Sequence, residues 1–296
     1  MTISQILAEK KVTVSFEMFP PKKQSNFENV LGAARELSAI RPDFMSITYG
    51  AGGTTKVNTV EIASKIISLG TPALAHLTCV GNTVESVRET AVTMREAGIE
   101  NVLALRGDMP QDSVQDGQSA LSEGLAHASD MTGILKAAGF CVGGACYPEG
   151  HPESANRNDD IENLRHKVDA GVDFLTTQMF FDNNMLYSYL YRLQSKGIRV
   201  PVLAGIMPVT NAGQVSRMIK LSNAFVPQKL LAICDRFEKN PDAMYQAGIA
   251  YATDQIIDLL SNGIRGIHIY TMNKPEVARD IMRNIDSIIG ACNSER

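Results

Sequence analysis

The chain has 296 residues, of which 44% are hydrophobic, so it is long enough to bury a large core in one α/β domain or two small ones. Its formal net charge of -4 argues against a nucleic-acid partner, because proteins that bind the phosphate backbone usually carry a clustered basic face. The five cysteines show no paired spacing, and neither a secretion signal nor a bilayer-spanning apolar stretch is visible, so we expect a reduced, cytoplasmic protein with no membrane segment.

Short β-rich runs alternate with longer stretches of helical periodicity from one end of the chain to the other, which is typical of βαβ units. Eight runs are predicted as strands: Val12–Phe19, Phe44–Tyr49, Ala73–Val80, Val102–Asp108, Cys141–Tyr147, Phe174–Phe181, Val200–Met207 and Ile267–Met272. Amphipathic stretches between them include Asn58–Leu69, Val84–Ala97, Ile161–Ala170 and Asn184–Ser195. Several end in a glycine suited to the left-handed residue after a helix: Gly70, Gly98, Gly139, Gly171, Gly197 and Gly263.

Eight such units, of roughly 30 residues each, fill the length typical of a TIM barrel. We therefore predict an α/β fold, a (β/α)8 TIM barrel with an additional helix before the last strand, in Pro227–Ser261. A doubly wound sheet shares the alternation and is the main alternative, but it normally needs fewer strands in one domain. No interdomain linker is visible, so residues 1–296 are predicted to form a single catalytic barrel domain.

One loop is distinguished by its length and composition. Met109–Gly124 is polar, contains two glycines and directly follows a predicted strand. Long polar loops at such positions are often functional, so we predict a mobile lid or rim loop.

Polar residues end almost every predicted strand. Catalytic groups of a barrel gather at the carboxyl ends of its strands, because the loops that follow form the open face. The strand ends carry Glu17, Thr48, Tyr49, His76, Arg106, Asp108, Tyr147, His151, Gln178, Thr271 and Asn273. Some would serve as caps or in salt bridges, but so many polar groups on one face predict an active site there.

Glu17 shares the inward phase of its strand with Ser15, which carries it to the barrel mouth. A carboxyl group partly desolvated at that point would have a raised pKa and could act as a general acid. The alternative is a simple salt bridge to a neighbouring lysine.

The segment ALRGDMP places a cation, a glycine and an anion at one strand end. Arg106 could pair with a phosphate, Gly107 would let the backbone approach a ring closely, and Asp108 could accept from a pterin or flavin N–H. The alternative is an internal Arg–Asp ion pair. The nearby YGAGGTT (Tyr49–Thr55) is a poor dinucleotide fingerprint but a reasonable turn for admitting a cofactor.

Asp160, Asn163 and Lys167 recur at helical spacing and so share one face, which could hold a ribose and a pyrophosphate or could simply be solvated. His76 suits either a cofactor contact or a satisfied core histidine. The five histidines show no metal-ligand spacing, so no metal is expected. No strand lysine suited to a Schiff base and no GxSxG elbow is present, which disfavours covalent catalysis.

In order along the chain stand VSFEMFPPK, SITYGAGG, AHLTCVG, ALRGD, YPEGHPE, LRHKVDAG, TTQMFFD, GIMPVTN and HIYTMNK. Together they resemble the catalytic domain of the methylenetetrahydrofolate reductase family over nearly the whole chain, in its short bacterial form without a regulatory domain. The resemblance implies an FAD-dependent oxidoreductase that reduces 5,10-methylenetetrahydrofolate to 5-methyltetrahydrofolate by a ping-pong mechanism. NADH or NADPH would be the hydride donor, the product would supply methyl groups for methionine synthesis, and the enzyme would be a homo-oligomer.

The resemblance also implies roles for individual residues. Glu17 matches the proton donor, and Asp108 a residue that contacts the pterin and tunes the flavin. Flavin contacts would come from Tyr49, Ala51, His76, Arg106, Gly107, Asp108, His127, Ala128, Tyr147, His151, Asp160, Asn163, His166 and Lys167. Thr48 matches a contact to the nicotinamide donor, and Gln178 one shared by donor and folate. Gln214 and Lys274 match folate contacts.

Three positions depart from the family pattern. Lys274 and His166 stand where arginines are expected, which at Lys274 keeps the charge but loses a bidentate fork. Met218 replaces a phenylalanine that packs on the ligand. These departures bear on affinity rather than on reaction type. Two other classes stay open: a non-redox barrel enzyme such as a pterin methyltransferase, which would bind no flavin, and a non-catalytic flavin- or folate-binding regulator.

Overall fold

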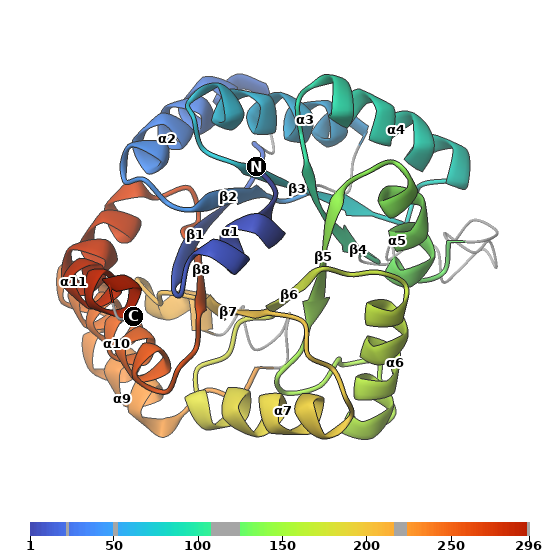
Figure 1. The fold of residues 1–296 in the computed structure, drawn as a ribbon. Coiled ribbons are helices and arrows are strands. Elements are labelled where there is room, and N and C mark those ends of the chain that lie inside the picture. The colour runs from blue at the N-terminus through green and yellow to red at the C-terminus, as the bar shows by residue number, and fades with distance from the viewer. Residues whose placement is uncertain (22–23, 50–52, 108–124, 216–223, 295–296) are drawn as a thin grey trace, which may run out of the picture.

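Eight parallel strands close into a barrel in sequence order (Figure 1). The computed structural model describes residues 1–21, 24–49, 53–107, 125–215 and 224–294. The strands are β1 Thr13–Met18, β2 Phe44–Ile47, β3 Ala73–Thr78, β4 Asn101–Leu105, β5 Cys141–Cys146, β6 Phe174–Thr177, β7 Val202–Ile206 and β8 Gly266–Tyr270. The predicted (β/α)8 barrel and its eight strands are confirmed, with small shifts at the strand ends, and β8 closes the ring against β1.

Helices alternate with the strands and surround the barrel (Figure 1). They are α1 Ile3–Glu9, α2 Phe27–Ala39, α3 Gly53–Ser68, α4 Val84–Glu96, α5 Ala128–Ala137, α6 Arg157–Asp169, α7 Asn183–Ser195, α9 Gln228–Phe237, α10 Pro241–Ser261 and α11 Pro275–Ser294, with a 3-10 turn, η1, at Gln24–Asn26. The six predicted turn glycines all have positive φ, between 77° and 107°. No helix of the described residues is long and apolar enough to cross a membrane.

The region predicted to hold an additional helix before the last strand holds two, α9 and α10. The side chain of Asn240 caps the second, accepting from the backbone N–H of Ala243 at 3.1 Å. Pro241 then occupies the first turn, where its missing N–H costs nothing. This cap and proline explain why the helical run is divided at residue 240.

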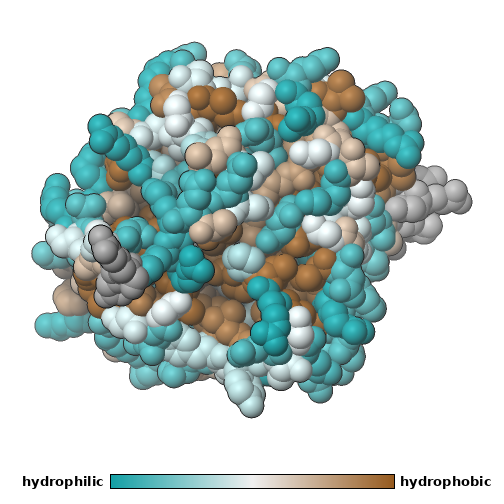
Figure 2. Space-filling model, viewed as in Figure 1, coloured by the Kyte–Doolittle hydropathy of each residue, from teal (hydrophilic) through white to brown (hydrophobic). Residues whose placement is uncertain are grey.

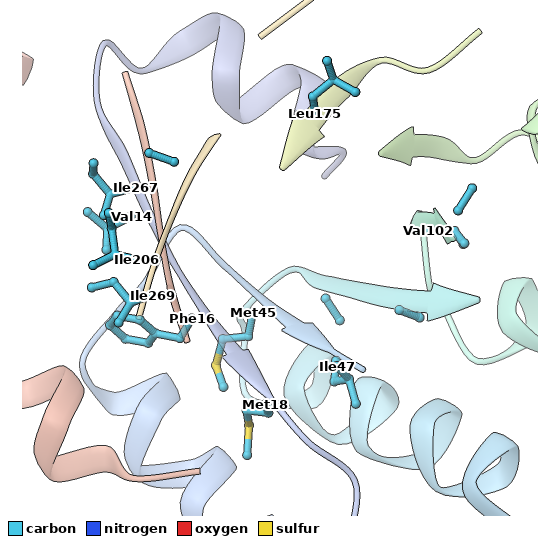
Figure 3. Close-up of a cluster of buried hydrophobic side chains, with 14 of the residues drawn as sticks. Val14, Phe16, Met18, Met45, Ile47, Val102, Leu175, Ile206, Ile267 and Ile269 are labelled. Atoms are coloured by element: carbon cyan, nitrogen blue, oxygen red, sulfur yellow. The ribbon is translucent and has the colours of Figure 1, made fainter. Parts of the chain in front are cut away.

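The outward faces of the strands form the main core against the helices. Val14, Phe16, Ile206, Ile267 and Ile269 gather where β1, β7 and β8 meet (Figure 3). Each of these side chains is nearly or fully buried. The alternation of the strands sends these apolar residues outward and leaves the other phase to fill the barrel.

The amino end of the barrel interior is apolar and closed. Phe44, Leu74, Leu103, Cys141, Phe174 and Leu203 point inward there, and Ile3 of α1 joins their cluster. The backbone N–H of Ile3 donates to the side chain of Asn101 at 2.7 Å, which holds α1 across the barrel end (Figure 1). Figure 2 shows this face, with hydrophobic residues visible between the hydrophilic ones near its centre. A ligand must therefore enter from the opposite, carboxyl end.

Two helical glycines provide a test of how tightly the outer helices pack. A Cβ on Gly248 of α10 would lie 1.9 Å from the carbonyl oxygen of Val209, whereas a Cβ on Gly290 of α11 would meet nothing within 4 Å. We expect Gly248→Ala to lower the free energy of unfolding by about 1–3 kcal/mol through overpacking. Gly290→Ala is the matched control and should raise it by about 0.5–1 kcal/mol. Chemical denaturation of both variants checks this, and equal effects would contradict the packing described for α10.

Candidate active site

Glu17 lies inside the carboxyl end of the barrel, on β1, and is 6% exposed. One carboxylate oxygen, Oε2, lies 3.4 Å from the hydroxyl of Ser46, 3.4 Å from Nε2 of His268 and 3.6 Å from Nε2 of His76. The strand register explains the arrangement, because Glu17 is level with Ser46 on β2 and with Tyr270 on β8. Among the described residues its neighbours are thus a serine and two histidines from three other strands. Lys22 and Lys23, which follow β1, lie outside those residues.

His268 is the part of this cluster that sequence reasoning missed. The ring is 1% exposed, and its Nδ1 lies 2.7 Å from the hydroxyl of Ser15. It stacks on Phe44 with 6.2 Å between ring centroids, and Nε2 is left facing Glu17. The signal was in the sequence: His268 is two residues before Tyr270 and so shares the inward phase of β8.

His76 is neutral in this environment. Burial lowers the pKa of its imidazole to about 4, the attraction of Glu17 opposes this, and the neighbouring His268 lowers the pKa further. Among the described residues its Nε2 has no hydrogen-bond partner, and neither has the hydroxyl of Thr176, which is also buried. Buried polar atoms are rarely left unpaired, so these two are places where a ligand would gain hydrogen bonds. This environment favours a ligand contact for His76 over a satisfied core histidine.

Arg106 and Gly107 follow β4 on the same face. The guanidinium forms a two-point ion pair with the carboxylate of Glu153: Nη1 contacts Oε2, and Nη2 donates to Oε1 at 2.7 Å. Asp108, the partner in the alternative interpretation, lies outside the described residues. Gly107 has φ 88°, and a Cβ there would lie 2.9 Å from Thr78. A side chain would therefore be strained at this position, both by the positive φ and by the side chain of Thr78 beside it.

The predicted face of α6 divides into two parts. Lys167 turns toward the barrel, where its Nζ donates to the carbonyl of Ala145 at 2.8 Å and its stem covers Gly144, and burial lowers its pKa. Asp160 is buried and accepts from the hydroxyl of Ser154 at 3.2 Å. Asn163 is exposed. The face is thus only partly solvated, and its two charged members lie against β5.

Five further predicted flavin positions lie in the loop after β5, at the start of α5 and on α6. His151 packs edge-on against the ring of Tyr147, with 4.6 Å between centroids. His127 begins α5, where its backbone N–H donates to Asp130 at 2.8 Å, and the adjoining Ala128 is buried. His166 is exposed on α6.

The positions predicted to contact nicotinamide and folate follow β2, β6, β7 and β8. Thr48 and Tyr49 follow β2, and burial raises the pKa of the Tyr49 phenol. The side-chain oxygen of Gln178 accepts from the N–H of Met179 at 3.0 Å. The side-chain oxygen of Gln214 accepts from the backbone N–H groups of Thr210 and Asn211, so its amide nitrogen is the atom that could donate to a ligand. Lys274 is exposed just beyond β8.

Two of the predicted strand-end residues, Thr271 and Asn273, form hydrogen bonds to the backbone of β1 and of the residue that follows it. The hydroxyl of Thr271 donates to the carbonyl of Glu17 at 2.8 Å, and the amide of Asn273 exchanges two hydrogen bonds with the backbone of Phe19. Met272 and Asn273 both take positive φ, which is unusual for residues other than glycine. These contacts tie the end of β8 to the end of β1 and hold the backbone that carries Glu17.

Several predicted features lie outside the described residues: Ala51, Asp108, Met218 and the loop Met109–Gly124. Among the residues that are described, no group of side chains is arranged to hold a metal ion, although Glu17, His76 and His268 converge.

A closed parallel barrel with a buried acid at its carboxyl end is the arrangement of a TIM-barrel enzyme. The chain belongs to the methylenetetrahydrofolate reductase family, whose model matches residues 2–286. It is 33% identical to the 5,10-methylenetetrahydrofolate reductases of Pectobacterium carotovorum and Escherichia coli, each over 96% of this chain and 94% of the relative. It is also 33% identical to methylenetetrahydrofolate reductase (NADH) 1 of Arabidopsis thaliana, over 97% of this chain but half the length of the plant protein.

Among solved structures, the fold is similar to that of a Clostridium thermocellum protein described as binding two copies of 5-methyl-5,6,7,8-tetrahydrofolic acid. The TM-score is 0.65 at 16% identity, over 98% of this chain and all of the other. At this identity the likeness establishes the shared barrel fold.

The low pKa of His76 can be tested by NMR titration of its imidazole C–H signal, assigned with His76→Gln. We expect a midpoint near pH 4 instead of the ordinary 6.5. The unfolded chain would then bind a proton that the folded protein does not, so the stabilisation is complete above pH 6.5 and is lost as the pH falls toward 4, by an amount on the order of 3 kcal/mol. A midpoint near 6.5 would contradict the burial of this ring.

Proposed function

We propose that this protein reduces 5,10-methylenetetrahydrofolate to 5-methyltetrahydrofolate, using FAD as cofactor and NADH or NADPH as hydride donor in a ping-pong cycle. The product would supply methyl groups for methionine synthesis, and the enzyme would work as a homo-oligomer of single catalytic barrel domains. The observation that carries the proposal is the buried Glu17 with its hydrogen-bonding neighbours in the barrel mouth, within a chain of this family. The NADH named for the plant relatives supports the choice of a nicotinamide donor.

The residues present fit a bound flavin. Gly107 takes a positive φ that suits a tight turn, and among the described residues the buried Nε2 of His76 has no hydrogen-bond partner. Arg106 and Lys167 supply cations for phosphates. The complete proposed set is Tyr49, Ala51, His76, Arg106, Gly107, Asp108, His127, Ala128, Tyr147, His151, Asp160, Asn163, His166 and Lys167. When bound, FAD supplies hydride transfer between the nicotinamide and the folate.

Glu17 would supply the proton that opens the folate substrate. The bridging methylene is attached to two nitrogens, and one C–N bond breaks when its nitrogen takes the proton of the Glu17 carboxyl group. The methylene carbon becomes part of an electrophilic iminium ion. When it accepts the hydride, it becomes a methyl group. Since Glu17 is enclosed by the barrel wall, water has little access to compete with the substrate for its proton.

The neighbours of Glu17 would keep its proton-bearing oxygen in place. Ser46 can donate to Oε2, and the Nε2 of His268 lies at the same distance, so the carboxyl group is held from two strands. Ser15 in turn fixes the orientation of His268 through Nδ1. Thr48 would contact the nicotinamide donor, Gln178 both substrates, and Asp108, Gln214 and Lys274 the folate.

Glu17→Gln tests the proposal because it keeps the shape of the side chain and removes its proton. We expect NADH oxidation with an artificial electron acceptor to stay within about twofold of the unaltered protein, while folate reduction falls by about 10²–10⁴-fold, the usual contribution of a general acid. The two rates are measured separately by stopped-flow absorbance.

Glu100→Gln is the control, because Glu100 stands at the opposite end of the barrel, where it pairs with the amino terminus. It should leave both rates unchanged. If Glu17→Gln reduced the folate as fast as the unaltered protein, Glu17 would not be the proton donor. A protein that took no electrons from NADH in either form would favour the non-redox methyltransferase class.

A further inference from the structure

The ion pair between Arg106 and Glu153 joins two loops at the carboxyl face. Each terminal nitrogen of the guanidinium contacts one oxygen of the carboxylate, so both nitrogens already have a partner. The side chains are 27% and 59% exposed, which places the pair at the surface of the mouth and not inside it. A phosphate prefers the same two-point geometry, because its oxygens have the spacing of a carboxylate.

Arg106 is held more firmly than Glu153. The backbone carbonyl of Arg106 accepts from the N–H of Val80 at 2.9 Å and from the thiol of Cys79 at 3.3 Å, which anchors the residue to the end of β3. Glu153 is in the loop between β5 and α6, where its N–H donates to the ring of His151 at 3.1 Å. When the two side chains part, the exposed Glu153 is therefore the one free to turn toward solvent.

Two of the cations on this face already have an anion beside them. Glu153 neutralises Arg106, and Lys167 has Asp160 nearby to attract its charge. Burial lowers the pKa of the neighbouring His151, which disfavours a positive charge on that ring. An arriving polyanion therefore meets little net attraction until a carboxylate moves away.

We propose that Glu153 competes with the phosphates of the flavin cofactor for Arg106 and thereby weakens and slows cofactor binding. The proposal rests on the proposed function, since it takes Arg106 to be a contact for the phosphates of FAD. Glu153 acts as an exchangeable counter-ion: it keeps the guanidinium paired and yields its place when the cofactor binds.

Glu153→Gln removes the negative charge and keeps the size of the side chain. We expect it to bind FAD about two- to fivefold more tightly, the range of a partly exposed ion pair, and to release it more slowly on dilution. Both quantities are read from flavin fluorescence, without any measurement of turnover. At about 1 M salt the difference should shrink, because the competing charges are screened.

Glu36→Gln is the matched control. Glu36 pairs with Arg279 between α2 and α11, and its side chain is 61% exposed, close to the value for Glu153. This variant should bind FAD as the unaltered protein does. The double variant Arg106→Gln/Glu153→Gln should bind no more tightly than Arg106→Gln alone, because Glu153 acts only through Arg106.

Unchanged affinity in Glu153→Gln would overturn the inference by placing the pair off the route of the cofactor. Weaker binding would also overturn it, since Glu153 would then hold Arg106 for the cofactor. In both cases the proposed function stands, because the unaltered protein still binds FAD. A protein that bound no FAD in any form would instead refute the proposed function, and this inference with it.

Discussion

A carboxyl group that is almost completely buried must be hydrogen-bonded, because an unpaired polar group is costly in a low-dielectric interior. Glu17 meets this requirement inside the barrel, where Ser46 and His268 reach its Oε2 from the neighbouring strands β2 and β8. The residues that contact Glu17 need to be held in place in their turn. His268 needs Ser15 to fix its ring, and Thr271 and Asn273 hold the end of β8 against β1. One buried acid thus determines residues on three strands and the loop that follows β8.

Because the amino end of the barrel is closed, a ligand can reach the site only from the carboxyl end. Ile3 and the inward-facing Phe44, Leu74 and Leu103 fill the amino half of the barrel, so the polar half opens only toward the carboxyl-end loops. His268 lies at the boundary, with Phe44 stacked on one side and Glu17 on the other. An apolar floor beneath a polar mouth allows the reacting part of a ligand to be held away from water while its polar groups are held at the rim.

The barrel could be predicted from the sequence because alternation and turn glycines are local signals. The inward direction of Glu17 could be predicted because it lies at a strand end, where a simple phase argument applies. His268 is level with Ser15, two residues deeper in the barrel than Glu17. It could be predicted only by noting that every second residue of β8 points inward. The partner of Arg106 could not be predicted, because Glu153 is 47 residues away and its approach depends on the path of a loop. Likewise, the inward turn of Lys167 depends on Gly144, which belongs to a different element.

One anaerobic absorbance experiment tests whether this barrel carries electrons from a nicotinamide to a folate through FAD. A spectrum of the purified protein is recorded alone, after NADH, and then after methylenetetrahydrofolate. We expect a flavin band that bleaches with NADH and returns with the folate. A colourless protein that also fails to bind added FAD would refute the proposed reductase and leave only the barrel fold.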